Sequence, residues 1–426
     1  MRIKVLMITL FLSLITGRMD LLIAQESKAS PDLQILIDEA LLNNPDYRSL
    51  EKQWQAAQTR ISQQGALPDP RLGLGVMNLP VNSFDFDQEP MTSKKVSIMQ
   101  MFPFPGKLGL KETIAEFQAE IVKQQKEELK NQLVKNVKTA YYNLFFIDKS
   151  IDIVKKNQVL LKQFVRVAET KYSVGKGLQQ DVLKAQVERS KLSDKILLLE
   201  QKRKTIIFRL NTLLNRNSDE PMGKIKDFEK SSFVATLDEL KKAALKNRPV
   251  LNSWQLMIEK SKSAEKLARK GYLPDFSLGA AYSQRDDLRS GAKMYDFFSA
   301  ELSLNLPIYF YKKQSQKVQE RQLLTMSNEE KYNTVKNRVL FQVENNWSEL
   351  TKDEQRIDLY KTGIIPLAGQ SLNSAMTGYQ VDKVDFLTLL NNQMTLFNFE
   401  MDYYRILADY QKTLAALEAA VGIVFK

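Results

Sequence analysis

The sequence predicts a mainly α-helical fold of long antiparallel coiled-coil helices, with four β-strands inserted among them and the whole pattern present twice. The stretch from Leu110 to Tyr172 contains neither proline nor glycine, and its apolar residues follow a seven-residue repeat typical of a coiled coil. Motifs from the first half return about two hundred residues later. At 1.5 Å per residue the long helix would reach roughly 95 Å, too far for one globular core.

Composition excludes several classes of function. The 426 residues include no cysteine and no histidine, which removes the commonest metal ligands, general bases and nucleophile pairs. We therefore expect no catalytic residue, no metal site and no cofactor. The formal charge is +12 and 26% of the residues are charged. Because lysine and arginine alternate with acids along the helices, this charge indicates a solvated surface and no nucleic-acid partner.

Residues 1–25 have the pattern of a signal peptide. Arg2 and Lys4 form a charged start, Val5 to Ile15 an apolar core, and Ala24 is a small residue before the cleavage point. The alternative is a short N-terminal anchor helix, although the apolar run is too short to span a bilayer. The pattern predicts export from the cytoplasm.

The first repeat covers residues 26–214. It opens with one helix from about Asp32 to Ala66, capped by Asp32 and ended by the prolines of the Leu67–Pro70 segment. Alternating apolar residues predict strands at about 71–79 and 95–102, joined by a polar loop. The long helix follows, turns at the two glycines after Tyr172 and returns as a second helix.

Both long helices of this repeat keep coiled-coil spacing. The seam of the first comprises Val137, Ala140, Leu144, Ile147, Ile151, Val154, Gln158, Leu161, Val165, Ala168 and Tyr172. The seam of the return helix includes Arg189 and Arg203 among apolar residues. Arginines at such positions favour a wet groove, or one lined by a partner, over a dry core.

A connector at residues 215–235 leads to the second repeat, residues 236–426, with strands at about 275–284 and 297–306. The correspondences pair Ala40–Pro45 with Ala244–Pro249, Leu67–Asp69 with Leu273–Asp275, Val137 with Val343, Leu144 with Leu350, Ile151 with Ile357, Tyr172 with Tyr379, and Gln186 with Gln393. In the second long helix, Gly363, Pro366 and Gly369 predict a break, because proline removes a backbone hydrogen bond and kinks a helix.

The strands have the alternation of a transmembrane β-barrel, apolar on one face and polar on the other. A half-buried strand of a soluble sheet shows the same pattern. Aromatic residues at 102–104 and 309–311 lie where an interfacial belt would fall, although junction packing would also place them there. Since the smallest barrels have eight strands, four strands per chain predict an oligomer.

The ordered motifs resemble those of the TolC-type outer-membrane efflux family, over essentially the whole mature chain. They are the duplicated Ala-Leu-x-x-x-Pro and Leu-Pro-Asp segments, Tyr172-x-x-Gly175 with Asp181-Val182-Leu183-x-Ala185-Gln186, and Ile365–Ala368 ahead of Tyr379. The resemblance implies a homotrimer with a transmembrane twelve-stranded β-barrel and an α-barrel extending through the periplasm. Such a protein is the passive exit duct of a tripartite efflux pump in outer-membrane lipid.

The family resemblance also implies partners. These are a periplasmic adaptor, or membrane fusion protein, and an inner-membrane pump. The stretch from Met101 to Leu108 is similar to members that work with heavy-metal resistance pumps, which implies a pump of the heavy-metal resistance-nodulation-division type.

By position, the family's adaptor-contacting tips match Val174, Gly175, Lys176, Gly177, Leu178, Val381 and Lys383. Its acidic entrance ring matches Asp181 in the first repeat; the second repeat has Thr388 there, so Asp382 or Asp385 would supply the acid. Three-fold repetition of a carboxylate would concentrate negative potential on the axis. The alternative for each acid is an ordinary solvated turn residue.

Two other functional classes are weighed against the channel. The first is a soluble periplasmic coiled-coil adaptor or scaffold whose strands form a small sheet. The second is a hydrolase that uses carboxylates alone, but no acidic pair lies in a recognisable loop signature.

Overall fold

The computed structural model describes residues 31–231 and 233–425, so the predicted signal peptide lies outside the described residues. The chain divides into two compact units. The sheet unit comprises Asp46–Leu129 and Lys241–Phe341, and the hairpin unit comprises the remaining segments. Among the described residues, no helix combines the length and apolar character needed to cross a bilayer.

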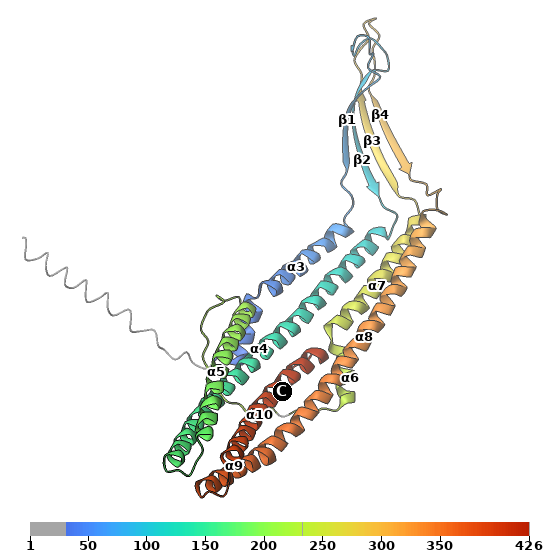
Figure 1. Cartoon of the computed structure of the whole chain (residues 1–426). Helices are drawn as coiled ribbons and strands as arrows, with labels where there is room; N and C mark the ends of the chain where they lie inside the picture. Colours follow the sequence, from blue (N-terminus) through green and yellow to red (C-terminus); the bar gives the residue numbers. More distant parts are fainter. Residues whose placement is uncertain (1–30, 232, 426) are drawn as a thin grey trace, which may run out of the picture. The chain divides into compact units, whose positions relative to one another are not determined.

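The sheet unit contains four strands: β1 (Arg71–Met77), β2 (Ser93–Phe102), β3 (Phe276–Gln284) and β4 (Phe297–Leu304). They form one antiparallel sheet in the order β1-β2-β3-β4 (Figure 1). Val96 lies opposite Leu74 on one side and opposite Tyr282 on the other. The central pair, β2 with β3, therefore joins segments from the two halves of the sequence.

Four helices adjoin these strands within the sheet unit. α3 (Pro45–Gly65) precedes β1, the first part of α4 (Lys107–Ser173) follows β2, α7 (Pro249–Arg269) with the short 3-10 helix Lys270–Tyr272 precedes β3, and the first part of α8 (Gln314–Leu359) follows β4. A small cluster of Ala57, Ala119 and Val122, with Trp54 against it, packs α3 on α4.

The prediction of one helix from Asp32 to Ala66 is wrong. The structure has α2 (Leu33–Asn43) and then α3, with Asn44 in an extended conformation (φ −62°, ψ 123°) between them. Pro45 disfavours α geometry for the residue before it and supplies no N–H, so the first helix ends there. Arg248 before Pro249 is likewise extended, between α6 (Leu237–Asn247) and α7.

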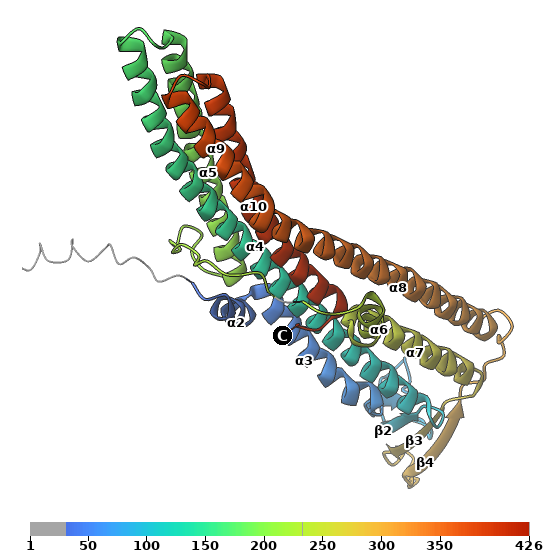
Figure 2. The ribbon, with the colours of Figure 1, turned by 90° about the horizontal axis from the view of Figure 1, so that it is seen from below.

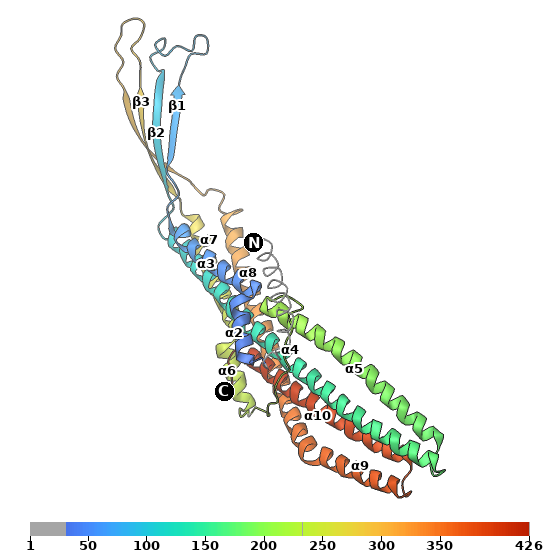
Figure 3. The same cartoon turned by 90° about the vertical axis from the view of Figure 1, so that its left-hand side faces the viewer.

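The hairpin unit contains two helical hairpins. The second part of α4 pairs with α5 (Gln179–Leu214), and α9 (Ile365–Gln380) pairs with α10 (Phe386–Val421); Figures 2 and 3 show the two hairpins side by side. One core joins all four helices. The predicted seam is buried from Val137 to Ala168 except at Gln158, which is only half-buried.

The neighbouring Asn157 faces the core in place of Gln158 and accepts a hydrogen bond from the buried side chain of Gln393 on α10. Gln158 instead donates to Ser193 Oγ on α5 at 3.0 Å. α4 thus presents two adjacent faces, one to α5 and one to the second hairpin. A single heptad seam describes contact with one partner only.

The connector lies on the helices of the hairpin unit. Arg203 of α5 donates to Asp148 of α4 at 2.6 Å and to the Met222 carbonyl at 3.1 Å. Asp148 also accepts the Ile225 N–H at 3.2 Å. Arg203 therefore links α5 and α4 to the connector of the same chain.

Candidate functional site

The first tip, residues 174–178, joins α4 to α5. Gly175 has φ +73°. The Lys176 N–H donates to the Lys171 carbonyl at 2.8 Å and the Gly175 N–H to the Tyr172 carbonyl at 3.0 Å. This is the Schellman ending of a helix, which needs a left-handed residue where Gly175 lies.

The second tip, residues 381–385, has the same backbone with a different side chain. Asp382 takes the left-handed conformation (φ +61°), and the Lys383 N–H donates to the Gly378 carbonyl at 2.9 Å. Asp385 then caps α10 by accepting the Thr388 N–H at 2.7 Å. Leu178, the matching residue in the first tip, makes no such cap bond.

A lysine connects the two tips. Lys171, near the end of α4, donates its ammonium group to the Asp382 carboxylate and to the Tyr379 carbonyl. Its ammonium also lies 4.4 Å from the centroid of the Tyr379 ring. The Lys171 side chain is only 13% exposed and that of Asp382 is 54% exposed. The hydrogen bond from Lys171 holds the pKa of Asp382 below its ordinary value.

These side chains surround one recess between the tips, which we call the tip recess. Three carboxylates and three lysines line it: Asp181, Asp382, Asp385, Lys171, Lys176 and Lys383. Gly177 and Leu178 line it as well. Burial raises the pKa of Tyr379, and the charges of Asp181 and Asp382 raise it further. Val174, Gly175 and Val381 lie in the same turns but outside the recess lining.

Sequence reasoning missed Lys171 and Tyr379. The second repeat has Gly378 at the position that matches Lys171, so the repeat pattern does not single out Lys171. Tyr379 belongs to the matched Tyr172 pair, yet Tyr379 is 5% exposed and Tyr172 is 49% exposed. Only the packing of the two hairpins distinguishes these positions.

The helical path is continuous where a break is predicted. Residues Tyr360–Ile364, with Gly363 among them, form one π-helical turn, and α9 begins directly at Ile365. The Ile365 N–H bonds to the Tyr360 carbonyl, five residues back. Pro366 and Gly369 lie inside α9. The wider turn accommodates the proline, so the hydrogen-bond pattern changes while the helix continues.

The sheet has one apolar face that is exposed in the single chain. Register places these side chains on the same side of neighbouring strands: Leu72, Leu74, Val96, Ile98, Leu278, Tyr282, Phe298 and Leu302. Each is 47% exposed or more. The other face carries Ser97, Ser277, Ser303 and Glu301. A face this apolar and this exposed is suited to contact with lipid.

Comparison with known proteins shows that the sequence matches one protein-family model. The model described as outer membrane efflux protein matches residues 36–216 and 240–423. No curated protein matches the sequence. Among solved structures, CusC, whose crystal structures concern transmembrane channel formation, has a TM-score of 0.79 at 16% identity, covering 93% of each chain.

Two further solved structures are similar in fold. The outer membrane protein VceC of Vibrio cholerae has a TM-score of 0.77 at 16% identity, over 92% of this chain and 97% of that one. The open state of the MtrE outer membrane channel of Neisseria gonorrhoeae has a TM-score of 0.74 at 16% identity, over 92% and 89%.

Proposed function

The chain belongs to the outer membrane efflux protein family, and from this premise we propose that it works as a homotrimer whose strands close one transmembrane β-barrel and whose long helices form an α-barrel. Its role is that of an outer-membrane efflux channel, and the soluble periplasmic adaptor or scaffold is not favoured. The duct is passive: the partner pump supplies the energy.

The open edges of the sheet are the observation that supports a trimer. β1 and β4 each pair on one side only within the described chain, so both outer edges are open. An open edge is not tolerated in lipid, because its backbone groups would lack hydrogen-bond partners. Three copies of the four strands would pair β4 of one chain with β1 of the next and give twelve strands.

We further propose the tandem repeats, residues 26–214 and 236–426 with the connector at 215–235. The order of helices and strands in the first segment recurs in the second. The shared Schellman geometry of the two tips supports the same assignment. The π turn, Pro366 and Gly369 would then lie partway along the second long helix, beside the connector and the C-terminus.

The tips are proposed to meet the periplasmic adaptor through Val174, Gly175, Lys176, Gly177, Leu178, Val381 and Lys383. Asp181, Asp382 and Asp385 would form the acidic entrance, with Lys171 holding Asp382. A heavy-metal resistance-nodulation-division pump is proposed from the Met101–Leu108 stretch alone.

Extraction and conductance test the channel assembly. The full-length protein should stay in outer-membrane pellets after high-salt washing and leave them in detergent as a heat-modifiable trimer. That trimer should conduct ions in planar bilayers. A monomer released by salt alone would overturn the proposal.

Single-channel recording tests the entrance separately. Asp181→Ala, Asp382→Ala and Asp385→Ala should each weaken cation selectivity and divalent block, because each removes three carboxylates from the trimer. Asp194→Ala, which removes an exposed acid of α5 outside the tip recess, is the matched control. Unchanged selectivity in all three variants would reject the entrance while leaving the channel itself intact.

A further inference from the structure

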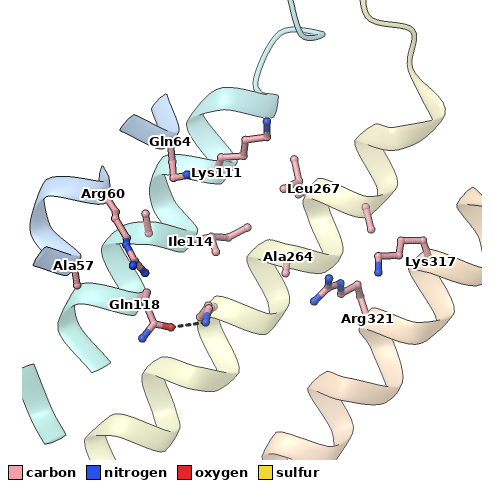
Figure 4. Close-up of a pocket in the computed structure, with 13 residues that line it drawn as sticks. Ala57, Arg60, Gln64, Lys111, Ile114, Gln118, Ala264, Leu267, Lys317 and Arg321 are labelled. Atoms are coloured by element: carbon pink, nitrogen blue, oxygen red, sulfur yellow. Dashed lines mark hydrogen bonds between the residues drawn. The ribbon is translucent and has the colours of Figure 1, made fainter. Parts of the chain in front are cut away.

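A second recess lies within the sheet unit, between α3 and α4 on one side and α7 and α8 on the other (Figure 4). Its volume is about 550 Å³. Five of its lining residues are cationic: Arg60, Lys111, Lys260, Lys317 and Arg321. Among the residues that the structure describes, no carboxylate lines it. We call it the basic recess.

The positive charge in the basic recess is only partly compensated. Lys317 pairs with Glu320 at 2.7 Å. Arg60, Lys111 and Arg321 make no hydrogen bond or ion pair with any described part of the chain, although Lys111 interacts electrostatically with Asp275 and Arg321 with Glu320. Elsewhere on these helices cations do have acidic partners, such as Lys126 with Glu51 at 2.6 Å. The absence of acids therefore distinguishes this recess from the mixed surface around it.

Lys260 and Arg321 are the partly buried cations of this recess. Lys260 lies between α7 and α4, and its ammonium group donates to the neutral Gln118 side chain at 2.6 Å. Burial lowers the pKa of Lys260, and the nearby charge of Arg321 lowers it further. A negatively charged group placed here would favour the charged form of Lys260 and so offset both effects.

The rest of the lining is apolar. Ala57, Ile114, Ala115, Ala264, Leu267 and Ala268 provide hydrocarbon surface between the cations. A small inorganic anion would leave this surface uncovered. A ligand with one anionic group and a hydrocarbon body would satisfy the cations and bury the apolar lining together.

We propose that the basic recess binds an amphipathic organic anion, with its anionic group near Lys260 and Arg321 and its body against Ile114 and Leu267. The ligand chemistry is shared by two sources, a free organic anion and the head group of an anionic phospholipid. The inference goes beyond the channel role, and neither the trimer nor the acidic entrance is needed for it.

The test uses the full-length protein in a neutral maltoside detergent. The probe is 1-anilinonaphthalene-8-sulfonate, and N-phenyl-1-naphthylamine provides the same ring system without the sulfonate. Binding is followed by fluorescence against a micelle-only blank. The sulfonate should bind saturably and the neutral compound far more weakly. Equal affinity for the two compounds would overturn the proposal.

Matched variants locate the binding. Lys260→Met and Arg321→Gln should each weaken sulfonate binding about tenfold, the usual effect of losing one charged hydrogen bond. Lys266→Met on α7 and Arg338→Gln on α8 remove exposed cations outside the recess and should bind like the wild type. Circular dichroism confirms that each variant is folded. Identical dissociation constants for recess and control variants would overturn the proposal.

Competition separates the two sources. Dioleoylphosphatidylglycerol added to the micelles should displace the probe if the recess takes lipid head groups, with dioleoylphosphatidylcholine as the neutral control. If only short alkyl sulfonates displace it, the ligand is a free anion. If neither displaces the probe from the wild type, the recess is not an anion site.

Discussion

At the scale of single residues, the two tips use one backbone geometry with different side chains. Gly175 and Asp382 both take the left-handed conformation. Glycine does so freely, whereas aspartate does so at a cost that hydrogen bonds to its side chain can offset. Asp382 has such a bond, from Lys171 of the other hairpin. The second tip therefore depends on Lys171 of α4, in the other hairpin, for its conformation.

Alanine substitutions of the glycines of α4 and the first tip should have different effects. Gly175→Ala should destabilise the tip by about 1 kcal/mol, because a side chain at φ +73° is strained. At Gly177 a Cβ would lie 3.0 Å from the Lys171 Cβ and 3.1 Å from the Tyr172 nitrogen, so Gly177→Ala should displace the end of α4. Hydrogen exchange of the Lys176 amide measures both effects.

Gly109 provides the control for these two variants. It lies inside α4, and apart from the adjoining residues and backbone of α4 no described atom lies within 4 Å of the position that a Cβ would take there. Gly109→Ala should be neutral or stabilising by about 0.5–1 kcal/mol, since alanine is the better helix former. Equal exchange rates in all three variants would contradict the assigned geometry.

The cross-tip ion pair should depend on pH only under acid conditions. The pKa of Asp382 is lowered in the folded state. The ion pair therefore contributes its full stabilisation above the ordinary carboxyl pKa, and this stabilisation is lost as the pH falls through the lowered pKa. Protection of the Lys383 amide, corrected for intrinsic exchange, should be flat from pH 8 to 5 and fall below about pH 4. In the Asp382→Asn variant, the Lys383 amide should be weakly protected at every pH in this range. A transition near neutrality in the wild type would contradict this account.

At the scale of elements, the π turn keeps two matched helical segments in the same packing although they differ in length by one residue. Val343 follows Val137 by 206 residues, whereas Tyr379 follows Tyr172 by 207. The extra residue enters between these points, and the π turn at Tyr360–Ile364 lies there. A π turn takes up one residue without rotating the helix beyond it. Leu372, Ala375 and Tyr379 consequently remain in the core.

Single-residue deletions test this interpretation. Deleting Gly363 should convert the π turn to α-helix and shift the thermal midpoint by only a few degrees. Deleting the exposed Ser374 within α9 should rotate one part of the helix by about 100° and remove a core side chain, at about 2–5 kcal/mol. Thermal unfolding followed by circular dichroism compares the two. Equal losses would show that the π turn does not store the extra residue.

At the scale of the whole molecule, the two faces of the sheet should tolerate charge differently. Leu302 is 63% exposed on the apolar face, and Leu302→Lys should destabilise the membrane-inserted protein by about 2–4 kcal/mol if it lies near the bilayer midplane. Ser303→Lys, one residue along on the other face, is the control and should be nearly neutral. The yield of heat-modifiable protein in the outer-membrane fraction measures both. Equal yields would argue against lipid contact on this face.

Much of this architecture is readable from sequence, because it rests on periodicity. The buried positions from Val137 to Ala168 follow a heptad, and the strand faces follow simple alternation. The first tip is marked by Gly175 and Gly177, and the second by the match of Asp382 to Gly175. These features can be predicted from patterns along the sequence, without knowing which distant segments pack together.

Other features depend on segments that are distant in sequence. Lys171 meets Asp382 across 211 residues, and the basic recess gathers cations from α3, α4, α7 and α8. Neither leaves a periodic signal. The helix end at Asn44 was locally readable, since Pro45 follows it, but the apolar pattern continues past the proline and conceals it. The π turn could not be predicted, because proline and glycine indicate that a helix is disturbed but not which geometry results.

The strand order has a consequence for how the finished channel is made. Every free chain has two unsatisfied strand borders, on β1 and β4. A row of two or more chains still has two unsatisfied borders. An incomplete assembly therefore lacks as many backbone hydrogen bonds at its borders as a solitary subunit does. Only the joining of last to first removes both borders together. Biogenesis of the proposed trimer should accordingly pass from separate subunits to complete rings, with incomplete ones too short-lived to accumulate.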